Sequence, residues 1–362
     1  MVKESMLYKV HEKSDFVTTY YLFSHIFTKY VIVHTNFKVF LKYFMKPYFY
    51  LDGICELADE FKGDENIYLG IRPYGFHAGN MSTLLVHPLL LCKEISKLGK
   101  VPRFNFFIFI NDWEQQKLDG VDPILYPFNV LPKFTTWQFM PDPIDNRFSI
   151  VDFWEPVILS NVNIINHYFP KTTAKSVRNS TMKTLPIMRK CLLQTIKHPE
   201  VVLKILRENS TKPTLDKAIY ASAVCPKCNA ARGNTKVISK NIIVHNCSNC
   251  HTTTKDKYEN FEYWFYHKPL ALPRIDAFKI DLCITGTDHY QEGDFEVRQK
   301  LFDAYKIKTP CPRTLYTPTI LGRNNLVMGK NKGNAENIGL DKLMQLIVEN
   351  PTKDQIKIPN II

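Results

Sequence analysis

The stretch Asn66–Met81, which reads NIYLGIRPYGFHAGNM, determines how the rest of the chain is interpreted. Residues 67–71 form a short apolar, partly β-branched run, which predicts a buried strand. Pro73, Gly75 and Gly79 then interrupt the apolar pattern and predict a turn. A strand, a glycine-rich turn and a helix start can hold a phosphate group against backbone N–H groups. An ordinary turn of an α/β domain is the alternative that this segment leaves open.

The segments that follow predict a parallel sheet. A helical pattern covers residues 81–98, with Pro88 expected to kink it. Residues 104–111, FNFFIFIN, predict a second buried strand. Strand, helix and strand at this spacing predict a right-handed βαβ unit, in which ligands lie beyond the carboxyl ends of the strands. We expect three polar side chains at that edge: His77, Asn80 and Asp112.

Composition limits the class of protein. With 362 residues, 45% hydrophobic and 23% charged, the chain can bury a sizeable core. A net charge of +12 favours an anionic partner, which could be a nucleic acid, a nucleotide or an acidic membrane surface. The charged N-terminus lacks a secretory signal, and no apolar run reaches the roughly 18 residues of a membrane span. We therefore expect a cytoplasmic protein without a membrane span, and the oligomeric state stays open.

The first 60 residues are rich in aromatic side chains with lysines interleaved. Phe37, Phe40, Leu41 and Phe44 recur at helical spacing and predict amphipathic helices. These helices could dock on a membrane surface or a partner. Packing onto the rest of the protein is the simpler alternative.

Four of the nine cysteines form two CxxC pairs separated by 18 residues. Two short β-branched runs between the pairs predict a hairpin, so the pattern is that of a zinc ribbon. The predicted zinc ligands are Cys225, Cys228, Cys247 and Cys250. Four thiolates close the coordination sphere, so we expect a structural site. His251 is an alternative ligand that we expect to be a bystander.

The last third of the chain adds further candidate residues. Residues 280–285 predict a third strand that leads into the sequence Gly286-Thr-Asp-His289, where a ligand contact is as plausible as a structural role. Pro310, Pro312 and Pro318 predict a linker. Lys330 and Lys332 follow on a glycine- and asparagine-rich loop suited to clamping phosphates, or to a solvated turn.

Residues 114–150 are rich in proline and predicted to be irregular, residues 153–207 are predicted to be largely helical, and residues 340–349 predict a closing helix. These patterns divide the chain into an N-terminal extension, the first half of the α/β domain, a helical insertion, the zinc ribbon and the second half of the α/β domain. The expected ranges are 1–60, 61–150, 151–220, 221–260 and 261–362.

Together these motifs resemble the catalytic core of class I aminoacyl-tRNA synthetases. GIRPYGFHAGN (70–80) is similar to the HIGH signature of that class, and VMGKNKGN (327–334) resembles its KMSKS signature. Residues 55–345 are most similar to class I lysyl-tRNA synthetases. Three segments carry this likeness, besides the CxxC pairs: Met140-Pro-Asp-Pro143, Arg274-Ile-Asp276 and Gly286-Thr-Asp-His289.

The resemblance implies an α/β, Rossmann-like nucleotide-binding domain that activates an amino acid, with lysine as first choice. ATP, Mg²⁺ and a structural Zn²⁺ would be the cofactors. His77 and Asn80 would contact the ATP phosphates, with Gly75 and Gly79 close to the nucleotide. Gly286, Asp288 and His289 would face the ribose and the amino acid. Lys330 and Lys332 would lie over the pyrophosphate, and the acceptor would be the tRNA acceptor stem.

The chain also departs from the family pattern. Val327 replaces the first lysine of KMSKS, and Ala277 stands where a tryptophan usually lines the amino-acid pocket. We expect the family's C-terminal anticodon-binding domain to be absent. The alternative hypotheses are a truncated relative that passes the aminoacyl group to another acceptor, and a non-catalytic nucleotide- or RNA-binding protein.

Overall fold

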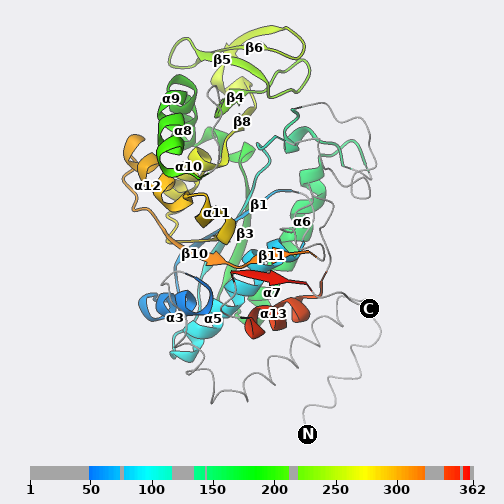
Figure 1. Ribbon diagram of the computed structural model, residues 1–362. Helices are drawn as coiled ribbons and strands as arrows, with labels where there is room; N and C mark the ends of the chain where they lie inside the picture. Colours follow the sequence, from blue (N-terminus) through cyan, green and yellow to red (C-terminus); the bar gives the residue numbers. More distant parts are fainter. Residues whose placement is uncertain are drawn as a thin grey trace.

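The centre of the molecule is a five-stranded parallel sheet (Figure 1). Its strands are β1 (Asn66–Ile71), β2 (Asn105–Ile110), β3 (Thr173–Arg178), β9 (Leu282–Gly286) and β10 (Arg313–Thr317). The computed structural model describes residues 49–73, 77–115, 134–142, 145–211, 219–322, 338–350 and 354–358. The amphipathic helices expected around residues 37–44 lie outside these residues, whereas the end of the expected N-terminal extension is described.

The strand order is β10-β9-β1-β2-β3, and every neighbouring pair is parallel. Leu69 of β1 lies opposite Ile108 of β2 on one side and Ile284 of β9 on the other. The chain therefore builds the sheet outward from β1 in one direction and later from β9 in the other. This is the doubly wound order, whose crevice opens where the two directions diverge. The predicted α/β, Rossmann-like fold class is confirmed.

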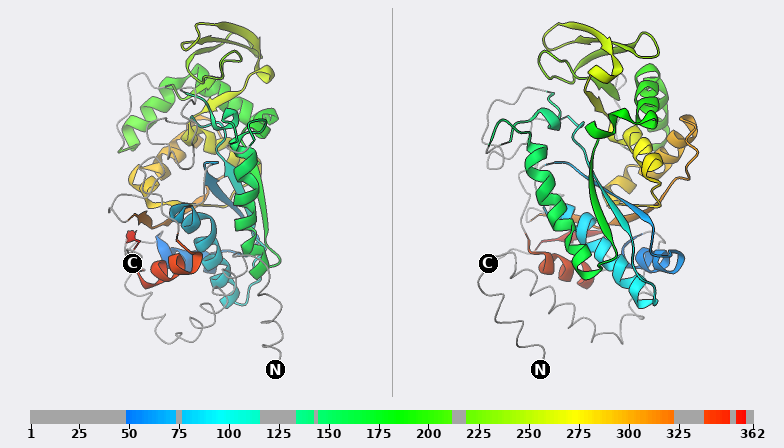
Figure 2. Two further views of the ribbon diagram at one scale, coloured as in Figure 1. Left: turned by 90° about the vertical axis from the view of Figure 1, so that its right-hand side faces the viewer. Right: turned by 180° about the vertical axis from the view of Figure 1, so that it is seen from behind.

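Helices cover both faces of the sheet (Figure 2). One face packs against α3 (Tyr50–Glu60), α5 (His87–Lys97), α6 (Ile150–Val162) and α13 (Leu340–Glu349). The other face packs against α8 (Pro186–Lys197), α9 (Pro199–Asn209), α10 (His267–Phe278) and α12 (Asp294–Ala304). Strand residues alternate between the faces, so Ile67, Leu69 and Ile71 belong to the first core and Tyr68 contacts the second.

Smaller elements complete the described structure. The ribbon strands β5 (Gly233–Val237), β6 (Ile242–Cys247) and β7 (Thr253–Lys257) form an antiparallel sheet of three strands where two were predicted. Two further pairs are β4 (Ala221–Ala223) with β8 (Tyr263–Phe265) and β11 (Thr319–Leu321) with β12 (Gln355–Lys357). The short helices are α7 (Ile164–Tyr168) and α11 (Thr287–Gln291), and the 3₁₀ turns are η3 (Trp137–Phe139), η4 (Ser180–Thr184) and η5 (Tyr258–Asn260).

The helical run after β1 continues past Pro88 without a break. It consists of α4 (Ala78–Met81), the π-helical segment η2 (Ser82–Val86) and α5. The wider π turn precedes the proline, which sits in the first turn of α5 where its missing N–H is tolerated. His87 Nδ1 lies 2.8 Å from the Ser82 carbonyl oxygen. Burial lowers the pKa of His87 to about 4, so its neutral ring donates this bond.

Two strands of the sheet were not predicted. The β3 sequence TAKSVR is polar and lies at the sheet edge, so it lacks the apolar run on which the strand prediction relied. The predicted linker around Pro312 and Pro318 is wrong, because these prolines flank β10, which pairs with β9. The region expected to be a helical insertion thus contributes β3 to the central sheet, and the five domain boundaries remain predictions. Within the described residues, no helix is long and apolar enough to cross a membrane.

Asp112 does not lie in a ligand site, contrary to the sequence interpretation. Its side chain is buried and accepts hydrogen bonds from the backbone N–H groups of Asn179 (2.8 Å) and Ser180 (3.3 Å) and from the Ser180 hydroxyl (2.5 Å). A carboxylate following β2 therefore fixes the turn that follows β3. The function of this residue is to hold two neighbouring strand ends together.

We predict that Asp112→Ala lowers the free energy of unfolding by about 3 kcal/mol, because two backbone donors and a hydroxyl lose a buried charged partner. Urea unfolding would measure the loss. The control is Asp145→Ala, which removes a surface ion pair with Arg147 and should cost under about 1 kcal/mol. Equal losses in the two variants would contradict the assigned role of Asp112.

Candidate functional site

A pocket of about 560 Å³ opens at the carboxyl ends of β1 and β9, where the strand order diverges. Ile71 and Arg72 line it from β1, Ile284 and Gly286 from β9, and Thr317 from β10. Ligands of doubly wound sheets bind at this position. The fold thus places a cavity at the edge predicted from the sequence.

Six of the predicted site residues line this one pocket: His77, Gly79, Asn80, Gly286, Asp288 and His289. The first three follow β1, whereas Gly286 ends β9 and Asp288 and His289 follow it, roughly two hundred residues later. Pairing of β1 with β9 brings the two groups together. The other three predicted site residues, Gly75, Lys330 and Lys332, lie outside the described residues.

His77 is held at the start of the helical run. Its Nδ1 accepts a hydrogen bond of 3.1 Å from the backbone N–H of Gly79. In the neutral ring the proton is therefore on Nε2, which can donate. A Cβ atom at position 79 would lie 3.0 Å from Cε1 of His77, so glycine keeps this contact relaxed.

Gly286 and Asp288 form a second tight contact at the pocket. A Cβ atom at position 286 would lie only 2.4 Å from Oδ1 of Asp288. Any larger residue would push this carboxylate away from the end of β9. Glycine at position 286 therefore leaves room for the carboxylate in its observed position, and Asp288 and His289 lie on α11 directly after the strand.

The pocket also extends along the face of the sheet covered by α10 and α12. Tyr68, Gly70, Cys283 and Thr285 line it from the strands, and Ala271, Lys268, Val297 and Arg298 line it from the helices. We call this part the deep lobe. Sequence reasoning missed all of these residues. One signal in the sequence could have identified the strand residues of the deep lobe. Tyr68, Gly70 and Arg72 alternate with the buried apolar residues 67, 69 and 71, so they face the opposite side of the sheet.

Arg274, which belongs to the family-like segment 274–276, is fully buried at the deep lobe. Its guanidinium donates to the Tyr68 hydroxyl oxygen (Nη1, 2.5 Å), to Asn111 Oδ1 (Nη2) and to Asn179 Oδ1 (Nε, 3.0 Å; Nη2, 2.6 Å). These acceptors come from three adjacent strand regions. One buried cation therefore ties the sheet to the pocket wall.

A charged cluster lies on the helix side of the deep lobe. Asp294 accepts from Lys268 Nζ through Oδ1 (3.0 Å) and from Arg298 Nη2 through Oδ2 (2.5 Å). Although burial opposes ionisation, Arg298 and Lys268 hold the pKa of Asp294 well below its usual range. Burial, together with His289 and Lys268, keeps the pKa of the neighbouring His267 well below 6.5, so this histidine is neutral at physiological pH.

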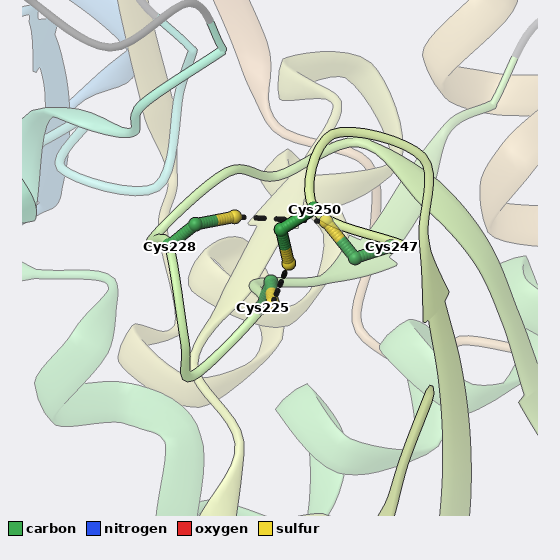
Figure 3. Close-up of side chains that lie close together, drawn as sticks. All are labelled: Cys225, Cys228, Cys247 and Cys250. Carbon is green, nitrogen blue, oxygen red and sulfur yellow. Dashed lines mark hydrogen bonds between the residues drawn. The ribbon is translucent and has the colours of Figure 1, made fainter. Parts of the chain in front are cut away.

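The four predicted zinc ligands converge in the ribbon (Figure 3). Their Sγ atoms all lie within 4.8 Å of one another, with 3.5 Å between Cys225 and Cys250 and 3.6 Å between Cys228 and Cys247. Tetrahedral coordination with Zn–S distances near 2.3 Å separates sulfurs by roughly 3.8 Å. The cluster therefore fits zinc closely.

The surroundings of the cluster also suit a metal. Asn249 donates to two of the sulfurs, from its backbone N–H to Cys247 and from Nδ2 to Cys228. Hydrogen bonding to Thr252 lowers the pKa of Cys250 to about 6, whereas burial raises the pKa of Cys225 and of Cys247, so a bound cation would be needed to hold all four side chains as thiolates. His251 is exposed and is not part of the cluster. The ribbon lies at one end of the molecule, away from the sheet (Figure 1), so a zinc ion there would act on folding.

Comparison with known proteins gave no matching family model and no matching curated protein. Among solved structures, tyrosyl-tRNA synthetase from Archaeoglobus fulgidus is similar at 13% identity and TM-score 0.36, covering 78% of this chain and 64% of that one. A putative arginyl-tRNA synthetase from Campylobacter jejuni is similar at 12% and 0.36, covering 84% and 70%. Glutamate-tRNA synthetase from Elizabethkingia anophelis is similar at 11% and 0.32, covering 76% and 54%.

The chain thus spans less than two thirds of the first of these structures. Similarity at this level does not assign an activity to this chain. The chemistry of its own pocket residues is therefore the basis for a functional proposal.

We predict that the purified protein carries about one zinc ion per chain. Cys225→Ser and Cys247→Ser should each release the metal and lower the melting temperature, because one of four thiolates is lost. Metal analysis and thermal unfolding would measure both effects. Cys311→Ser, which changes a half-buried cysteine outside the cluster, should retain the zinc. A zinc-free wild-type protein, or a disulfide within the cluster, would refute the prediction.

Proposed function

We propose that this protein binds ATP in the pocket between β1 and β9 and activates an amino acid as an aminoacyl-adenylate. One observation carries the proposal: the residues that resemble two separate synthetase motifs, His77 with Asn80 and Asp288 with His289, line the same pocket. A pocket at the switch point of a doubly wound sheet is the usual place for a nucleotide. The whole activity would be that of a class I synthetase-like ligase.

The residue types fit phosphoryl chemistry without a protein nucleophile. The amino acid's carboxylate would attack the α-phosphorus of ATP, one carboxylate oxygen would bond to phosphorus, and the bond to the β-phosphate would break. Pyrophosphate would leave with the electron pair. The carboxylate is already ionised, so no general base is needed, and positioning with charge stabilisation suffices.

Individual side chains have distinct roles in this proposal. Nε2–H of His77 would donate to a phosphate oxygen, and Asn80 would contact the same group. Asp288 and His289 would face the ribose and the α-ammonium group of the amino acid. Lys330 and Lys332, assigned from the sequence motif, would neutralise the pyrophosphate. Bound Mg²⁺ would neutralise further phosphate charge.

The acceptor of the aminoacyl group and the identity of the amino acid are also proposals. We propose tRNA as the acceptor of the aminoacyl group, approached through its acceptor stem, because the net charge of +12 favours a nucleic-acid partner. Lysine is the amino acid that the sequence resemblance puts first. The chemistry of the deep lobe favours a different class, for the reasons given in the next subsection.

The test is ATP–pyrophosphate exchange with each of the twenty amino acids, combined with calorimetry of ATP binding. We predict exchange with at least one amino acid, and a loss of about a hundredfold in its rate in His77→Ala, because a preorganised donor to the phosphates is removed. His198→Ala changes an exposed histidine between α8 and α9 and should leave the rate unchanged. A wild-type protein that neither binds ATP nor supports exchange would overturn the proposal.

A further inference from the structure

The buried guanidinium of Arg274 dictates the direction of hydrogen bonds in the deep lobe. A guanidinium carries five N–H donors and no acceptor, so each of its partners must turn an oxygen toward it. Asn111 therefore presents Oδ1 to Arg274, and the Tyr68 hydroxyl presents its oxygen. The orientation of both groups is therefore set by Arg274 and does not depend on a bound substrate.

Both groups are consequently left as donors. With Oδ1 of Asn111 engaged, its Nδ2 hydrogens face elsewhere, and Asn111 lines the pocket. The Tyr68 hydroxyl hydrogen is likewise directed away from Arg274, and Tyr68 lines the pocket as well. Within the described part of the chain, neither of these donors has an acceptor. The strand side of the deep lobe therefore presents hydrogen-bond donors, and a ligand would have to supply the acceptor.

The helix side of the deep lobe also presents hydrogen-bond donors. Lys268 and Arg298 bring two cations, and both oxygens of the intervening Asp294 are taken by them. Asp294 is therefore not available to bind a cationic substrate group. Three other carboxylates line the pocket: Glu114, which forms an ion pair with Arg72, and Asp288 and Glu292, which follow the end of β9. We assign Asp288 and Glu292 to the α-ammonium group common to all amino acids.

Tyr68 lies far from the place where the reacting end of the substrate would bind. Tyr68 precedes Ile71 by three residues, so it lies about 10 Å down the strand from the pocket mouth at a rise near 3.3 Å per residue. His77 and Asn80 lie beyond the end of that strand. The deep lobe would therefore receive the part of the substrate farthest from the phosphates, which is the amino-acid side chain.

We propose that the deep lobe selects an amino acid whose side chain ends in a hydrogen-bond acceptor, either a carboxylate or a carboxamide oxygen. This inference rests on the proposed function and names its substrate class. A lysine side chain would bring three more donors and a positive charge to a surface that already presents donors and two cations. Its ammonium group would lose its water partners without replacement.

The sharpest test is Asn111→Asp. The substituted side chain still offers an oxygen to Arg274, so the buried network keeps its partner, but the pocket receives an acceptor in place of a donor. Asn105→Asp is the matched control, because it makes the same charge change at the opposite end of β2. Calorimetry without ATP would measure binding of aspartate, glutamate, asparagine, glutamine, lysine, arginine and leucine to each protein, and ATP–pyrophosphate exchange would be run in parallel.

We predict that the wild type prefers one of the four acceptor-bearing amino acids, with acids and amides distinguished directly by the panel. Asn111→Asp should weaken binding of that amino acid about a hundredfold, and Asn105→Asp should leave it unchanged. A wild-type preference for lysine, arginine or leucine overturns the inference, as does an equal effect of the two variants. Binding of none of the seven also overturns it.

The two proposals can fail separately. Exchange supported by lysine alone would overturn the assignment of the deep lobe and leave ATP-dependent activation intact. Selective binding of glutamate or glutamine without any ATP–pyrophosphate exchange would overturn ATP-dependent activation and leave the assignment of the deep lobe intact. A circular dichroism melt of Asn111→Asp close to that of the wild type is expected, because Arg274 retains an acceptor.

Discussion

The double pairing of β1 is the constraint on which the rest of the structure depends. This strand hydrogen-bonds to β2 on one side and to β9 on the other, so its backbone is buried and both of its faces must be covered. Apolar residues at 67, 69 and 71 form one core, and the helices α10 and α12 close over the opposite face. Because the connections leave β1 and β9 in opposite directions, no backbone fills the space beyond their ends, and the pocket is a result of the topology.

A second constraint operates inside this frame. Arg274 is a buried cation whose partners in the described structure are neutral oxygens of Tyr68, Asn111 and Asn179. A buried charge must be fully hydrogen-bonded, so these side chains have little freedom to turn. The same network that stabilises the centre of the sheet therefore determines which atoms face a ligand. Structure and recognition share the same hydrogen bonds in this region.

The sequence predicted the parts whose signal is local. The apolar runs at β1, β2 and β9, the helix α13 and the CxxC spacing all agree with the structure, because burial or metal binding dictates their residue types. Polar β3 and proline-flanked β10 were missed, since sheet pairing with distant neighbours, not local composition, makes them strands. Asp112 shows the same limit at the site: its position after a strand was right for a ligand, but its hydrogen-bond partners come from the turn that follows β3. Tyr68, Asn111 and Arg274 act as a group, and only the fold brings them together.

The pairing of Ile67 with Leu282 also determines when the central sheet can finish forming during synthesis. As the chain emerges during synthesis, β1, β2 and β3 can assemble early, but β1 then has an open edge until about a hundred further residues have been made, because β3 ends at Arg178 and β9 begins at Leu282. An unpaired apolar strand edge is prone to wrong partners, and contacts so distant in sequence form slowly. The ribbon and the helices α8 and α9 emerge during this interval. The protein should therefore depend on chaperones at that stage, and cleavage between β3 and β9 during synthesis would leave a fragment with half a sheet and no pocket.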